Sequence, residues 1–62
     1  MQHFLKMMIE DTIKKNEAEE NKWHVYELCK RDIEWWEKRY EHWLSPNDYH
    51  KHIDYITEKL NI

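Results

Sequence analysis

The chain of 62 residues contains no glycine, a single proline and a single cysteine, Cys29. Glycine is the residue that most often ends helices and forms tight turns, so its absence removes the usual turn signals. It also excludes the glycine-rich loops that bind nucleotide phosphates. A lone cysteine excludes a disulfide within one chain and is typical of a protein kept in a reducing compartment.

Long apolar runs are absent as well. The longest has three residues, Met7 to Ile9, whereas a membrane-spanning helix needs about 20. The segment 1–15 lacks the basic start and the long apolar stretch of a signal peptide. We therefore expect a cytoplasmic protein that does not cross a membrane.

The charge is mild, because the net value is −3 and both signs are interspersed among the 37% of charged residues. This balance disfavours nonspecific binding to nucleic acid, which depends on Lys and Arg neutralising phosphates. Gly, Ala, Arg and Pro, whose codons are GC-rich, are scarce, whereas residues with AT-rich codons are common. The bias indicates an AT-rich genome, such as that of a low-GC bacterium or its phage.

Helical periodicity predicts an all-α fold in a single domain, residues 1–62, with helices at about 2–15, 17–44 and 46–61. The middle helix would be about 42 Å long, about as long as the outer two together. We therefore expect each outer helix to fold back on one end of this long central helix, giving two helical hairpins. Such a layer has little interior of its own, so a homodimer would complete the bundle.

The clearest helix boundary lies in the stretch LSPNDY. Ser45 is predicted to cap the last helix, which begins at Pro46, and Asp48 to complete a capping box. Leu44 and Tyr49 occupy the two positions of a hydrophobic staple.

A second boundary is expected at Asn16, because Glu19 follows three residues later as in a capping pair. Lys14 and Lys15 would end the first helix with charges that suit its dipole. One unbroken helix through this segment is the alternative, since Glu and Ala are good helix formers.

Apolar residues recur at alternating spacings of three and four, which is the pattern of a coiled-coil-like seam. We expect this seam to form the core or a dimer interface, with Trp36 and Trp43 buried. Cys29 would then be a small buried hydrophobic residue rather than a nucleophile. The seam residues are Tyr26, Cys29, Ile33, Trp36, Tyr40 and Trp43 on the central helix and Tyr49, Ile53, Ile56 and Leu60 on the last helix.

Trp35 lies about 100° around the helix from Trp36, on a second stripe. The only two arginines of the chain, Arg31 and Arg39, stand four residues before and four residues after it. Guanidinium groups at this spacing can hold the ring by cation–π contact, and Trp and Arg are enriched in binding hot spots. A second subunit could instead cover this stripe, or Trp35 could be merely exposed. The predicted partner-binding surface is Leu28, Arg31, Trp35, Arg39 and His42.

The five histidines form no familiar metal-ligand pattern. Helical ligands usually stand four residues apart, as in H-E-x-x-H, or form E-x-x-H pairs. His50 and His52 are two residues apart and diverge on a helix. We therefore expect no metal, no other cofactor and no catalytic residue, so the protein is not expected to be an enzyme.

These features favour a small protein–protein interaction module that regulates or inhibits a larger protein and forms a homo-oligomer. Two alternatives remain. One is a nucleic-acid-binding protein, although the last helix carries only two lysines against three carboxylates. The other is a structural homo-oligomer with no separate ligand.

Overall fold

The computed structural model describes residues 2–62, which form three α-helices and no strand. The helices are α1 (His3–Lys15), α2 (Lys22–Tyr40) and α3 (Pro46–Leu60). The all-α prediction with three helices is therefore confirmed. The bounds of α1 and α3 agree with the sequence to within a residue, whereas α2 is shorter than predicted at both ends.

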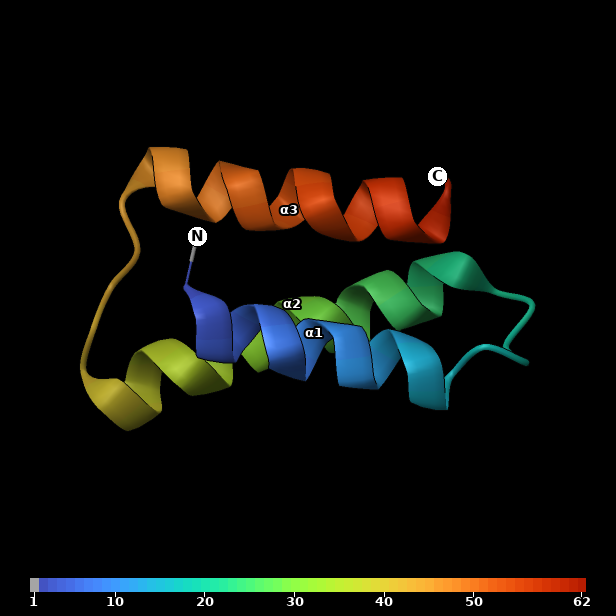
Figure 1. Cartoon of the computed structure of the whole chain (residues 1–62), viewed down its shortest axis with the longest axis horizontal. Coiled ribbons are helices and arrows are strands. Elements are labelled where there is room, and N and C mark those ends of the chain that lie inside the picture. Colours follow the sequence, from blue (N-terminus) through green and yellow to red (C-terminus); the bar gives the residue numbers. More distant parts are fainter. Residues whose placement is uncertain (1) are drawn as a thin grey trace.

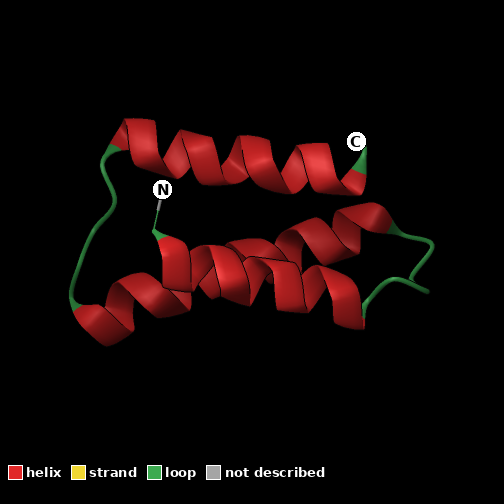
Figure 2. Cartoon of the chain, viewed as in Figure 1, coloured by secondary structure: helices red, strands yellow, loops and turns green. Residues whose placement is uncertain are grey.

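The three helices form one bundle rather than two hairpins on a long rod. α2 runs antiparallel to both α1 and α3, and the two connections lie at opposite ends of the bundle (Figures 1 and 2). α2 has 19 residues, or about 28 Å, so it is longer than α1 (13 residues) and α3 (15 residues) but far shorter than the expected length of about 42 Å. α1 and α3 also contact each other directly, so all three helices enclose a common interior.

A single chain closes this interior by itself. The accessible surface is 4640 Å², close to the roughly 4,500 Å² of a compact monomer of 8.0 kDa. The expectation that one chain has little interior of its own is therefore wrong. That expectation depends on a central helix of about 42 Å, because two outer helices that each cover a different half of so long a helix cannot contact each other.

The core draws on all three helices. α1 contributes apolar side chains at a spacing of four, α2 along four successive turns and α3 at its carboxyl end, which is the pattern of helices that each bury one face. Full burial of such a side chain stabilises the fold by about 1.5–3 kcal/mol. The core consists of Leu5, Ile9, Val25, Cys29, Ile33, Trp36, Ile56 and Leu60.

The predicted seam is buried or half-buried except near the connection between α2 and α3. Cys29, Ile33, Trp36, Ile56 and Leu60 lie in the core, while Tyr26 and Ile53 are half-buried against it. Val25, which stands outside the predicted seam, is fully buried. The exposed members of the seam are Tyr40, Trp43 and Tyr49.

Trp43 is 66% exposed, so the expectation that it is a core residue is wrong for the single chain. α2 ends at Tyr40, and the next residue, Glu41, adopts the left-handed conformation with φ 49°. Beyond this turn the spacing of three and four no longer describes one face of a helix. The sequence contains no glycine at this point that would signal the turn.

Backbone and side-chain hydrogen bonds hold the turn after α2. The N–H of His42 donates to the carbonyl oxygen of Glu37 at 3.0 Å, which closes a Schellman-type C-cap. The N–H of Leu44 donates to the Glu37 carboxylate at 2.9 Å. Ser45 then accepts a hydrogen bond from the Asp48 N–H at 3.2 Å, and α3 begins at Pro46, as the sequence predicts.

The connection between α1 and α2 confirms the predicted break but not its chemistry. Asn16 does not cap α2; its side-chain amide donates to the Thr12 carbonyl oxygen at 2.7 Å, so it closes the carboxyl end of α1. The Glu19 carboxylate accepts from the Asn21 N–H at 3.0 Å, and α2 begins only at Lys22. Asparagine can serve either helix end because its side chain both donates and accepts.

His52 is the only fully buried polar side chain among residues 2–62. Neither ring nitrogen has a hydrogen-bond partner within this part of the chain. Burial lowers the pKa of His52 below its ordinary 6.5, because the charged form loses its solvation, and the nearby Asp48 carboxylate opposes this only in part. The folded protein therefore favours the neutral ring.

We predict that replacing Glu41 with glycine stabilises the protein. The left-handed conformation at Glu41 costs a residue with a β-carbon about 1–2 kcal/mol, whereas glycine adopts it freely but loses more chain entropy on folding. The free energy of unfolding should rise by about 0.5–1 kcal/mol, measured by urea denaturation. Glu27→Gly, in the exposed middle of α2, should lower it by about 1 kcal/mol. A destabilised Glu41→Gly variant would contradict this account of the turn.

We also predict acid-sensitive stability from His52. Because its folded pKa lies below 6.5, the stabilisation is complete above pH 6.5 and is lost as the pH falls below that value. One proton gives a slope of at most about 1.4 kcal/mol per pH unit. This pH dependence is measured by urea denaturation between neutral pH and about pH 5, because most carboxyl groups titrate below that range. His52→Met should abolish the slope, and parallel curves for the two proteins would exclude His52 as its source.

Candidate protein-binding groove

A hollow of about 440 Å³ opens where the start of α1 meets the end of α2, and we call it the aromatic groove. Its floor is Trp36, which is 7% exposed, and its walls include Phe4 and Tyr40, which are 52% and 49% exposed. The surface of the hollow is mainly apolar. The residues that line it are Gln2, Phe4, Trp36, Tyr40 and His42.

The rings of the groove contact one another, edge to face for Phe4 with Tyr40 and for His42 with Trp36, and at a tilt of 46° for Trp36 with Tyr40. The centroid of Tyr40 lies 5.6 Å from that of Trp36 and 6.1 Å from that of Phe4. The His42 ring lies 5.3 Å from Trp36 at an interplanar angle of 79°. These distances are in the favourable range for aromatic pairs, so the rings hold the groove in shape while their outer surfaces stay accessible.

The local sequence explains why these side chains converge. Trp36 and Tyr40 stand four residues apart and therefore lie on one face of the last turns of α2. The left-handed turn at Glu41 reverses the chain direction, which returns His42 to the Trp36 ring. Phe4 reaches the same place because the antiparallel packing of α1 and α2 brings the start of one beside the end of the other (Figure 1).

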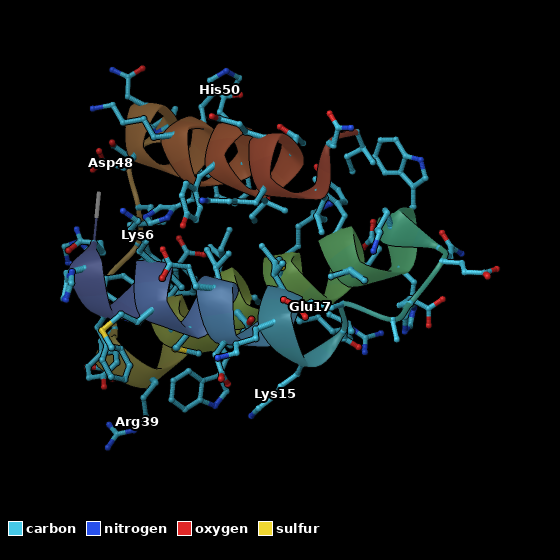
Figure 3. All side chains as sticks on the ribbon, turned by 45° about the vertical axis from the view of Figure 1, so that its right-hand side comes forward. Lys6, Lys15, Glu17, Arg39, Asp48 and His50 are labelled. Atoms are coloured by element: carbon cyan, nitrogen blue, oxygen red, sulfur yellow. The ribbon has the colours of Figure 1, made fainter. Side chains whose placement is uncertain are left out.

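A cation borders the groove. The guanidinium carbon of Arg39 lies 5.5 Å from the centre of the Tyr40 ring. Arg39 and Lys15 point away from α3, whereas Lys6 points from α1 toward α3 (Figure 3), where its amino group lies over the Tyr55 ring. Within residues 2–62, no carboxylate lies within 4.0 Å of Arg39. The groove therefore combines an apolar hollow with an unpaired positive charge.

Two carboxylates of α1 and α2 are engaged within the bundle. Asp11 forms an ion pair with Lys15 at 2.9 Å. Asp32 accepts a hydrogen bond from the Thr12 hydroxyl, and burial raises the pKa of its carboxyl group in spite of that bond.

The structure divides the surface that the sequence predicts for a partner. His42 and Arg39 belong to the aromatic groove or its edge. Leu28 is half-buried, and Trp35 is 50% exposed outside the groove. Arg31 lines a separate, more polar hollow with Glu27, Lys30 and Tyr49 among its neighbours. The proposed sandwich of Trp35 between two arginines is not observed, since Arg39 lies over Tyr40 instead.

Sequence reasoning missed Gln2 and Phe4 as residues of the site. Phe4 lies outside the face of α1 that buries Leu5 and Ile9, so its exposure follows from the helical pattern. Its contact with Tyr40 joins residues 36 positions apart in the chain. No local signal predicts such a contact, which depends on how two helices pair.

The single thiol of the chain lies outside the groove and is shielded. Cys29 is fully buried, and burial raises the pKa of its thiol to about 12, so the reactive thiolate is disfavoured. Within the described part of the chain, no three His, Cys, Asp or Glu side chains gather as metal ligands would. None of the helices between residues 2 and 62 combines the length and apolar character required to cross a bilayer.

Comparisons of the chain with models of protein families, with curated proteins and with solved structures found no match. The chain's own geometry is therefore the basis for a functional proposal.

Proposed function

We propose that this protein is a small protein–protein interaction module, and that the aromatic groove is its binding site. The observation that supports the proposal most directly is the half-exposure of Phe4 and Tyr40 around the buried Trp36. A chain that closes its own core has no folding requirement to leave these rings accessible. Rings held rigidly around a hollow are the kind of surface that binds an apolar side chain of a partner.

Arg39 supports the same proposal. Its guanidinium group lies beside the hollow, over Tyr40, with no carboxylate of the described chain within 4.0 Å. Arginine and aromatic residues together are the most common anchors of protein interfaces. A partner that fills the hollow and places a carboxylate beside Arg39 would use both features.

The proposal includes no catalytic step, and the protein acts by occupying a surface of its partner. A chain of 62 residues can regulate or inhibit a larger protein in this way, because one well-packed anchor dominates the affinity of many interfaces. Homodimerisation through an exposed aromatic surface belongs to the same class of function. Its signature is a change in oligomeric state rather than the capture of a second protein.

We predict that Tyr40→Ala weakens partner binding at least about tenfold, since removal of a central aromatic anchor typically costs more than 1.4 kcal/mol. The partner is captured with the tagged wild-type protein from cells of its source and purified. Its affinity for each variant is then measured by titration calorimetry.

Trp35→Ala is the matched control, because Trp35 has the same exposed fraction as the groove walls but lies outside the groove. It should bind within about twofold of wild type. If Trp35→Ala abolishes binding and Tyr40→Ala does not, the partner uses the stripe on α2 and the groove is not the site. Circular dichroism confirms that each variant is folded.

A protein that binds only DNA or RNA, with an affinity that is lost as the salt concentration rises, would have a nucleic-acid function instead of the proposed one.

A further inference from the structure

Besides Trp35 and Trp43, a third exposed tryptophan lies at the end of the bundle that is remote from the groove. Trp23 is in the first turn of α2 and is 60% exposed. Its ring contacts the Tyr26 ring edge to face at 5.5 Å, which orients it while its outer face remains accessible. At 1.5 Å per residue along α2, about 26 Å separates Trp23 from Tyr40. Trp23 therefore cannot reach the groove of its own chain.

The segment around Trp23 is acidic. Residues 16–28 contain four glutamates and one lysine, a net charge of −3 that equals the net charge of the whole chain. Glu27 lies four residues after Trp23, on the same face of α2. The single lysine of the segment, Lys22, donates a hydrogen bond from its amino group to the Glu17 carbonyl oxygen. The rest of the molecule, including the groove with Arg39, is neutral as a whole.

The two ends of the molecule each present an aromatic feature beside a charged side chain, and the two charges have opposite signs, although Lys30 lies over the Tyr26 ring near Trp23. One end has an apolar hollow bordered by an unpaired guanidinium, and the other has a projecting indole on a helix that also carries Glu27. The hollow is shallow and largely open to solvent, with a volume of about 440 Å³, so a projecting ring can lie on its apolar surface without entering a closed cavity. Opposite charges beside such a contact favour the correct orientation.

We propose that the occupant of the groove is a second copy of this chain, with its Trp23 in the hollow and its Glu27 beside Arg39. The inference rests on the proposed function, because it names the partner of the same groove. Trp23 and the groove lie at opposite ends of α2 and about 120° apart around its axis. The contact is therefore head to tail, and each copy that binds leaves a new groove and a new tryptophan free. Such association extends into a ring or a filament instead of stopping at a dimer.

The test is sedimentation velocity of the full chain over a wide range of concentrations. Wild type should form species larger than a dimer as the concentration rises. Trp23→Ala and Tyr40→Ala should each weaken self-association at least about 30-fold, the effect of losing a hot-spot aromatic. Trp35→Ala, the control outside both surfaces, should behave as wild type.

Mixing the two variants gives the sharpest outcome. Trp23→Ala retains a groove and Tyr40→Ala retains the projecting tryptophan, so an equimolar mixture should form a 1:1 heterodimer that cannot extend. A mixture that stays monomeric, or a wild type that is monomeric at every concentration, would overturn the inference. Both substituted side chains are about half exposed, and thermal melts verify that the variants fold.

Charge variants supply a second route that leaves the aromatic rings intact. Arg39→Glu and Glu27→Lys should each weaken self-association. A mixture of the two single variants should recover part of it, because Glu at position 39 of one copy can then meet Lys at position 27 of the other.

The two proposals can fail separately. If the wild type is monomeric but Tyr40→Ala still lowers the affinity for a foreign protein, only the self-association is overturned. If Tyr40→Ala changes neither self-association nor foreign binding, the proposed function fails as well.

Discussion

The packing of Trp36 is the interaction on which both the core and the groove depend. Its ring is 7% exposed, packed among the apolar side chains of all three helices, and its remaining surface is the floor of the groove. The side chains around that floor, Phe4, Tyr40 and His42, are held by contact with Trp36 or with one another. The shape of the binding surface is therefore inherited from the core, and any change that loosens the core also alters the groove.

Much of the fold could be predicted from the sequence because its signals are local. Ser45 and Pro46 define the start of α3 through the geometry of one helix end, and the structure has the predicted hydrogen bond there. The break near Asn16 is likewise present, although Asn16 closes α1 instead of opening α2. Helical periodicity located five seam residues in the core, because burial of one helix face requires that spacing.

The errors arose where the backbone departs from what the side chains suggest. The apolar pattern continues past Tyr40 to Trp43, but the left-handed conformation of Glu41 ends the helix without a glycine to announce it. That single turn shortens α2, exposes Trp43 and brings His42 to the groove. His52 illustrates a second limit, since its neighbour His50 lies on the outer face of α3 (Figure 3) while His52 is fully buried. The groove itself depends on the contact between Phe4 and Tyr40, which no local pattern encodes.

Cys29 offers a way to observe how the bundle moves. It is the only thiol of the chain and has no exposed surface at the centre of α2. A thiol-specific reagent can modify it only when α1 or α3 separates from α2, because in the closed bundle burial both excludes the reagent and raises the pKa of the thiol. The modification rate therefore reports the frequency of helix separation in the native state, with no engineered probe needed.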